Sequence, residues 1–196
     1  MKPPEDLRRR VLDASLALIA QEGLEAFSMR EVARRAGVSH QAPYHHFPDR
    51  EAIMAAIVAE GFAKLRDETL AAGEGAADKF DRLTRIGRAY VGFALRHPAH
   101  FKLMFRSEWV DAEKHTEAGA CAEGAFAVLS EAISALARGP DGEPERTTLM
   151  MAWSLAHGLA TLLLEGKLEK MTGGVGESQA AIDALFAQFE TMMRAR

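Results

Sequence analysis

The chain has 196 residues with a formal net charge of −4, of which 48% are hydrophobic and 27% charged. This composition is typical of a globular protein and excludes a polycationic nucleic-acid binder, so any nucleic-acid site must be local. The single cysteine excludes an internal disulfide and a cysteine-based zinc site. The polar N-terminal stretch MKPPEDLRRR lacks the apolar core of a signal peptide, and we therefore expect a cytoplasmic protein.

Residue types that favour helices greatly outnumber those that favour strands. The chain contains 36 Ala, against 8 Val, 6 Ile and 8 Thr. Ala is the best helix former, whereas β-branched residues favour strands. The composition therefore predicts an all-α protein.

Helical periodicity recurs along the whole chain, and Gly and Pro separate the periodic segments. Ser28 and Glu31 form the capping-box pattern at the start of one helix, and Asp49 is expected to cap another. A loop is expected at 172–176. The pattern predicts about nine helices and no strand, with the helices at 6–21, 29–36, 40–47, 50–70, 78–95, 99–106, 112–137, 144–170 and 179–194.

One predicted helix contains an unusually apolar run. Residues 147–164 include no Asp, Glu, Lys or Arg. A membrane-spanning helix needs about 20 apolar residues, and this shorter run also contains Ser154, His157 and three Thr. We interpret it as a helix buried in a core or a subunit interface, and we expect no membrane partner.

Residues 28–47, SMREVARRAGVSHQAPYHHF, predict a short helix, a tight turn and a second short helix. Gly37 lies where the turn requires a positive φ, and Ser39 is expected to cap the second helix. This spacing is typical of a helix-turn-helix, which places its second helix in the DNA major groove. The predicted core of this domain consists of Val11, Leu18, Ile19, Val32, Ala36 and Phe47.

Polar residues around this motif are the candidate DNA-binding residues. His40 and Gln41 open the second helix, where side chains reach base edges, and Gln can pair with adenine. Residues 1–50 contain 8 Lys and Arg against 7 Asp and Glu, so spacing and not charge carries the prediction. The run 8–10, three Arg, is either a phosphate contact or a solvated helix start. The predicted DNA-binding set is Ser28, Arg30, Ser39, His40, Gln41, Tyr44, His45 and Arg50.

Residues 8–60 resemble the N-terminal domain of the TetR family of transcriptional repressors. The resemblance is carried by RRRVLDASLALIAQEGLEAFSMREVARRAGVS and by YHHFPDRE. Three positions depart from the family pattern, because Ala42 replaces Thr or Ser, Pro43 replaces Leu and His45 replaces Tyr. Pro43 has no N–H to donate to the carbonyl of Ser39, so we expect it to tilt or tighten the start of the second helix.

The C-terminal part also resembles one TetR subgroup. Trp153, His157 and Gly158 match a Trp-x-x-x-His-Gly signature, and HPAHFKLMF at 97–105 is similar to the same subgroup. The resemblance implies a helical bundle that dimerises and binds a small ligand. In the alternative interpretation, Trp153 fills the core and His157 bonds a carbonyl. The candidate ligand-pocket residues are Phe101, Phe105, Trp109, Trp153 and His157.

Together these patterns predict a DNA-binding domain at 1–49 and an effector-binding and dimerisation domain at 50–196. The expected function is that of a sequence-specific regulator, a homodimer on a palindromic operator, with repression relieved by a small, apolar effector. The dimer face is expected on the apolar helices at 145–168 and 178–195. Two alternatives remain open: a helical ligand-binding protein without DNA binding, and a helical enzyme acting on an apolar molecule. We expect no cofactor, no metal site and no catalytic site, since no corresponding motif is recognised.

Overall fold

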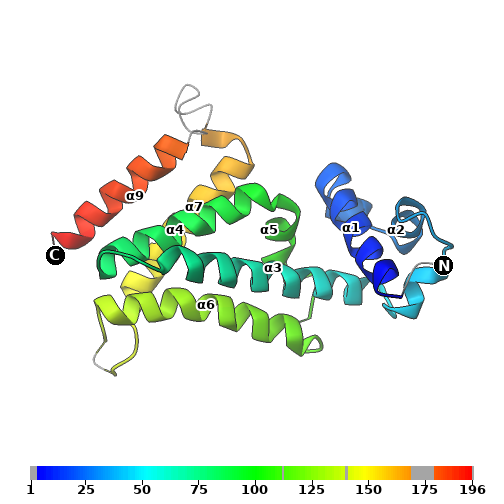
Figure 1. Cartoon of the computed structure of the whole chain (residues 1–196), viewed down its shortest axis with the longest axis horizontal. Helices are drawn as coiled ribbons and strands as arrows, with labels where there is room; N and C mark the ends of the chain where they lie inside the picture. Colours follow the sequence, from blue (N-terminus) through cyan, green and yellow to red (C-terminus); the bar gives the residue numbers. More distant parts are fainter. Residues whose placement is uncertain (1–3, 112, 140, 169–178, 196) are drawn as a thin grey trace. The chain divides into compact units, whose positions relative to one another are not determined.

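The computed structural model describes residues 4–111, 113–139, 141–168 and 179–195. Within these ranges the regular structure is helical and no strand is formed, which confirms the all-α prediction (Figure 1). The described residues form eight α-helices and two 3-10 helices, against about nine helices expected from the sequence. The predicted loop at 172–176 lies outside the described residues.

The described helices follow one another in the order that the periodicity predicts. The apolar helix predicted to extend to residue 170 ends at Leu164, because Gly166 adopts a left-handed φ of 61° that closes the helix. The elements are α1 (Pro4–Glu22), η1 (Leu24–Ala26), α2 (Met29–Arg35), η2 (Ala42–His45), α3 (Arg50–Gly73), α4 (Lys79–Arg96), α5 (Pro98–Met104), α6 (Thr116–Leu136), α7 (Arg146–Leu164) and α9 (Gln179–Arg194).

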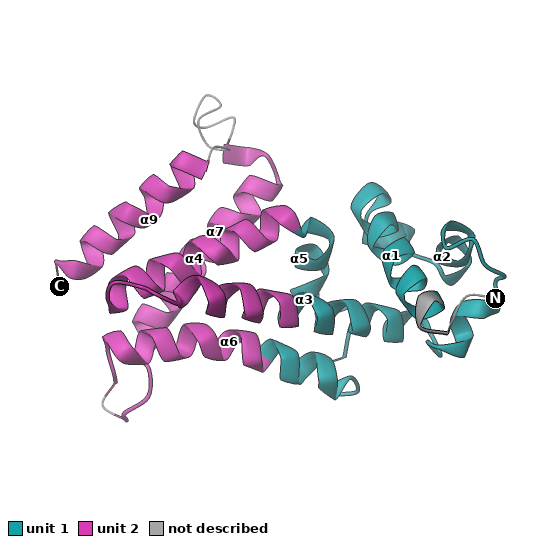
Figure 2. Ribbon diagram, viewed as in Figure 1, with its two compact units in different colours: residues 1–62, 97–122 teal, residues 63–96, 123–196 magenta. Residues whose placement is uncertain are grey.

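The chain divides into two compact units, which are coloured separately in Figure 2. Unit 1 comprises residues 1–62 and 97–122, and unit 2 comprises residues 63–96 and 123–196. The predicted boundary between residues 49 and 50 does not coincide with a boundary of these units, and it stays a prediction.

The core of unit 1 contains all six apolar residues that the sequence assigns to it. Val11, Leu18 and Val32 are fully buried, and Ile19, Ala36 and Phe47 are nearly so. Helix α1 packs against α2, η2 and α5. Burial of these side chains is the main favourable term that fixes the helix-turn-helix against α1.

Unit 2 is built around α4, which packs against both α7 and α9. The contact with α9 depends on Gly87, because a Cβ at this position would lie 2.3 Å from Cε1 of the buried Phe186. Only a residue without a side chain lets the Phe186 ring lie against α4 in this way. The shared core consists of Leu83, Ile86, Val128, Ala132, Ile133 and Ala152.

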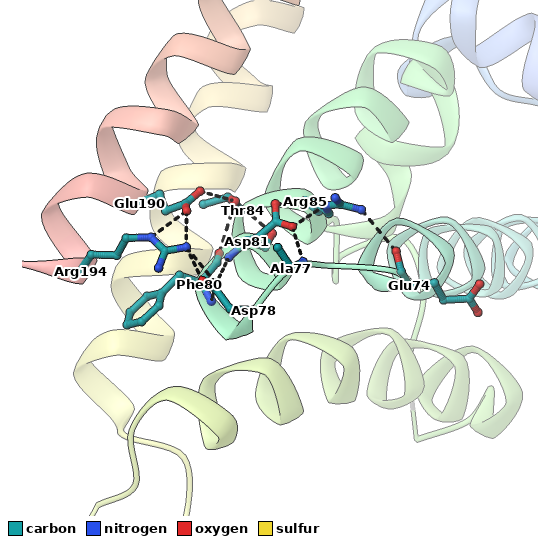
Figure 3. A network of polar contacts seen from close by, with 9 residues as sticks. All are labelled: Glu74, Ala77, Asp78, Phe80, Asp81, Thr84, Arg85, Glu190 and Arg194. Carbon is teal, nitrogen blue, oxygen red and sulfur yellow. Dashed lines mark hydrogen bonds and ion pairs between the residues drawn. The ribbon is translucent and has the colours of Figure 1, made fainter.

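A polar network joins the end of α9 to the start of α4 (Figure 3). The Arg194 guanidinium lies 2.7 Å from Asp78 Oδ2 and 2.7 Å from Glu190 Oε1, and it stacks over the ring of Phe80. Hydrogen bonds from the Asp81 backbone N–H and from Arg194 hold the pKa of Asp78 below its usual value. The network therefore holds the end of α9 against the start of α4 within unit 2.

Two of the described helices, α6 and α7, are long and apolar enough to cross a membrane by length and composition alone. The sequence prediction identified only the run in α7, because α6 contains Glu117, Glu123 and Glu131. A core or interface helix of a soluble protein meets the same criteria.

Candidate nucleic-acid interface

The first half of the helix-turn-helix has the geometry that the sequence predicts. Ser28 caps α2, and its Oγ accepts a hydrogen bond from the Glu31 backbone N–H at 3.2 Å. Gly37 has a φ of 65°, which confirms the predicted left-handed turn. The Val38 N–H donates to the Ala33 carbonyl at 3.0 Å and closes the turn.

The second half differs from the predicted helix at 40–47. It is the 3-10 helix η2, its N-cap is Gln41 and not Ser39, and no side chain caps it. Pro43 explains the difference, because it cannot donate to the Ser39 carbonyl, which instead accepts from the Ala42 N–H at 3.0 Å. The expected tightening at Pro43 is therefore confirmed, and it shortens the second helix to less than two turns.

The predicted DNA-binding residues all lie on the surface of unit 1. His40 and Tyr44 form an edge-to-face ring pair with centroids 5.8 Å apart, and Tyr44 is 41% exposed. Both side chains are therefore exposed on the surface of unit 1. Every residue of the predicted set is exposed: Ser28, Arg30, Ser39, His40, Gln41, Tyr44, His45 and Arg50.

The three arginines that open α1 have partners within unit 1. Arg8 lies over the Phe47 ring at 5.4 Å, and Arg9 forms an ion pair with Glu60 at 2.7 Å. Arg10 donates to the carbonyl oxygens of Ala36 and Gly37 at the end of α2. Arg10 therefore holds the turn, a role that the sequence did not reveal because its partners are backbone carbonyls.

An ion-pair cluster on α2 was also missed. Glu31 Oε1 lies 2.6 Å from Arg34 and 2.9 Å from Arg35. Hydrogen bonds from these two side chains lower the pKa of Glu31 to about 2. The spacing of three and four residues along a helix is the signal that could have identified the cluster.

The start of α3 is held by the connection between α5 and α6. Asp49 caps α3 as predicted, because its Oδ1 accepts from the Ala52 N–H at 2.8 Å. The Arg50 guanidinium lies 5.4 Å from the centroid of the Trp109 ring, which is a cation–π contact. The structure thus brings together a predicted DNA-binding residue and a predicted pocket residue.

A pocket of about 240 Å³ lies in unit 1 beside this connection. Of the predicted pocket residues only Phe105 lines it, and Phe101 packs on Phe105 with ring centroids 5.1 Å apart. Most of the lining is apolar, with Arg106 and Ser107 as its polar members. The lining residues are Val58, Phe62, Leu103, Met104, Phe105, Arg106, Ser107, Val110, Ala118, Gly119 and Ala122.

Trp153 and His157 belong to unit 2. The His157 Nδ1 and the Tyr90 hydroxyl are 2.7 Å apart, so the Tyr90 phenol is a hydrogen-bond partner of His157. Burial lowers the pKa of His157 and raises that of Tyr90, so both groups are neutral near pH 7. Trp153 is 41% exposed and does not fill the core of the unit, contrary to the alternative interpretation of this residue.

Large apolar side chains of unit 2 are exposed on α6, α7 and α9, and also at Leu70 on α3 and Leu95 on α4. Met150 on α7 is 65% exposed and Met192 on α9 is 58% exposed. A Cβ placed on Gly158 of α7 would meet no atom of the chain within 4 Å. The other exposed apolar residues of these helices are Phe126, Met151, Trp153 and Leu162.

Among the described residues no three His, Cys, Asp or Glu side chains are grouped so as to hold a metal ion. The rings of His97 and His100 pack edge to face with centroids 5.9 Å apart. His100 is buried, and its Nε2 lies 3.5 Å from Glu60 Oε1. This pair joins α5 to α3 within unit 1.

The capped α2, the Gly37 turn and the exposed η2 define a helix-turn-helix protein of the DNA-binding class. Residues 11–57 match the family described as "Bacterial regulatory proteins, tetR family", and residues 83–189 match "Tetracyclin repressor-like, C-terminal domain". The chain belongs to the TetR family, and it is a DNA-binding transcriptional regulator. The Trp-x-x-x-His-Gly subgroup stays a prediction.

Similar proteins and structures agree with this assignment. The chain is 38% identical over 85 residues to the HTH-type transcriptional regulator BetI of Rhizobium meliloti (strain 1021). The aligned residues cover 43% of this chain and 42% of BetI. It is 22% identical over 176 residues to the HTH-type transcriptional repressor AcnR of Corynebacterium glutamicum, covering 87% and 85% of the two chains. A solved structure of a protein with unknown function from Rhodococcus sp. RHA1 has a TM-score of 0.73, 26% identity and 94% coverage of both chains.

Proposed function

We propose that this protein is a repressor that binds a palindromic operator as a homodimer and leaves it when a small apolar effector binds. The exposed row around η2, with Gln41 and Tyr44 at its centre, is the observation that carries the DNA-binding part. AcnR, which aligns with most of the chain, is named a repressor. Such a regulator acts where the DNA is, which supports a cytoplasmic location.

In this proposal η2 enters the major groove and its neighbours contact the backbone. Gln41 reads a base edge, because a Gln side chain can make two hydrogen bonds to adenine. Tyr44, His45 and Arg50 contact phosphates, which carry no sequence information by themselves. Ser28 and Arg30 at the start of α2, and Ser39 and His40 before η2, complete the interface.

The dimer face is proposed on α7 and α9. Met150 and Met192 are largely exposed in the single chain, and such exposed apolar side chains are typical of an interface. The open space at Gly158 gives room for the close approach of a second helix. A two-fold dimer would hold its two η2 segments about 34–36 Å apart, the spacing of successive major grooves.

The effector site is proposed at the apolar pocket of unit 1. Its volume of about 240 Å³ and its aliphatic and aromatic lining suit a small apolar molecule. Phe101 supports the wall through Phe105, and Trp109 lies next to the lining residue Val110. An effector that fits another arrangement of these helices better would shift the population away from the DNA-bound state.

The DNA-binding proposal is tested by measuring the affinity of variants for a set of duplexes by fluorescence anisotropy. Gln41→Ala should cost about 1–3 kcal/mol on the preferred duplex and relax the preference at one base pair. Tyr44→Ala should weaken binding to all duplexes about equally. Glu25→Gln, at an exposed position of unit 1 outside the proposed DNA-binding set, is the control. Equal losses on every duplex for Gln41→Ala would remove its assignment as a base reader.

A further inference from the structure

The connection between α5 and α6 has two sets of contacts within unit 1. Arg106, Ser107 and Val110 line the apolar pocket. Trp109, Asp111 and Lys114 of the same connection contact the first turn of α3, at Arg50 and Glu51. One short segment therefore lies against both the proposed effector and the proposed DNA-binding residues.

Glu51 on α3 receives most of the contacts from this connection. Its Oε2 lies 2.6 Å from Lys114 Nζ, and its Oε1 accepts a hydrogen bond from the Asp111 backbone N–H at 3.2 Å. His115 Nε2 lies 3.4 Å from the same carboxylate. The bond from Lys114 and that from Asp111 hold the pKa of Glu51 below its usual value, so the carboxylate is ionised near pH 7.

A second contact lies one residue earlier on α3. The Trp109 ring lies under the Arg50 guanidinium at 5.4 Å. We call these two contacts, Trp109 with Arg50 and Lys114 with Glu51, the α3 latch. Arg50 belongs to the proposed DNA interface, and Phe47, three residues before it, is a buried core residue of that domain.

Of the segments that line the pocket, we expect the connection between α5 and α6 to change conformation most easily. Of the other lining residues, Phe105 directly follows α5 and the rest lie on α3, α5 and α6, whose backbone hydrogen bonds are internal to each helix. Helices α3 and α5 are also in close contact, since a Cβ on Gly61 would lie 2.6 Å from Met104 Sδ. By contrast, Arg106 and Ser107 are exposed and lie outside a helix, where local opening costs least.

We infer that the α3 latch couples the pocket to the DNA interface: an occupant displaces the connection, breaks the latch and releases Arg50 and the first turn of α3. This inference rests on the proposed effector site. It assigns Glu51, Lys114 and Trp109 as positioning residues that contact neither effector nor DNA. The chain without an occupant keeps the latch closed and binds DNA tightly.

The test compares two latch variants that change the charge in opposite directions. Lys114→Met removes a positive charge and Glu51→Gln removes a negative one. If only the charge attraction to DNA phosphates mattered, Lys114→Met would weaken DNA binding and Glu51→Gln would strengthen it. The latch instead predicts that both variants weaken DNA binding, about five- to tenfold, a typical size for coupling between sites. Lys102→Met and Glu25→Gln, both at exposed positions of unit 1, are the matched controls.

The second measurement is the response of DNA affinity to 1-octanol, with Ala122→Phe as a variant that fills the pocket without a ligand. Octanol binding is followed by calorimetry and by Trp109 fluorescence in a Trp153→Phe background, which contains no other Trp. We expect octanol and Ala122→Phe each to weaken DNA binding by the native chain, and neither to weaken it further in the latch variants.

Two other outcomes would overturn the inference, and they are distinguishable. If filling the pocket weakens DNA binding equally in the native chain and in the latch variants, the effector site stands and the latch is wrong. If octanol binds in the pocket and DNA affinity stays unchanged in the native chain, both the effector site and the latch are wrong.

Discussion

The close contact between Gly87 and Phe186 makes a quantitative prediction about unit 2. In Gly87→Ala the new methyl group would start 2.3 Å from Phe186 Cε1. Carbon atoms pack at about 3.5–4.0 Å, so the ring must move away by about 1.2–1.7 Å. Phe186 is only 2% exposed, so we expect α9 to move with its ring.

The free energy of unfolding follows from two opposing terms. Overpacking costs about 1–3 kcal/mol, and a rigid ring places the cost in the upper part of that range. Ala in place of Gly inside a helix returns about 1 kcal/mol. The net loss should be about 1–2 kcal/mol, measured by urea unfolding followed by circular dichroism at one protein concentration.

The matched control is the same substitution at Gly124 on α6. A Cβ there would lie 3.6 Å from Arg66 Cδ, which is an ordinary contact. Gly124→Ala should therefore gain about 0.5–1 kcal/mol of stability from helix propensity alone. A Gly87→Ala variant as stable as the native chain, or more stable, would show that the packing of α9 does not depend on this contact.

Three further predictions concern the turn, the dimer and pH. Arg10→Met should remove the bonds to the Ala36 and Gly37 carbonyls and destabilise unit 1 by about 1.5–3 kcal/mol; calorimetry showing an unchanged melting temperature would contradict it. Gly158→Ala should weaken the dimer by about 1–3 kcal/mol in sedimentation equilibrium, and an unchanged dimer would exclude α7 from close helix contact. Burial lowers the pKa of His157, so the unfolded state binds more protons and stability should fall as the pH drops below about 6.5. Urea unfolding at pH 7.5 and 5.5 should show a smaller difference for His157→Gln than for the native chain, and an equal difference would contradict the prediction.

The helices and the first half of the helix-turn-helix could be predicted because their signals are local. Ser28 with Glu31 is a capping pattern, and Gly37 follows from the conformation that the turn requires. The apolar positions of α1 and α2 follow from helical periodicity. The replacement of a regular second helix by η2 was only partly anticipated, since Pro43 pointed to a tightened start and not to a shorter helix.

Contacts between distant parts of the chain could not be read from the sequence. Arg10 binds backbone carbonyls 26 and 27 residues away, and no sequence pattern marks such acceptors. The partner of His157 is Tyr90, 67 residues earlier, on another helix. The predicted pocket residues all have aromatic rings, whereas the pocket of unit 1 is lined mostly by aliphatic side chains that packing brings together.

We propose that η2 and its neighbours read a DNA sequence as part of a dimer. A selection of bound sequences from random duplex DNA at near-physiological salt tests this proposal. We expect to recover a palindrome whose half-sites lie one helical turn, about 10 base pairs, apart, or a multiple of it. Recovered sequences that are no more enriched than those bound non-specifically would show that the chain does not read DNA sequence in this way.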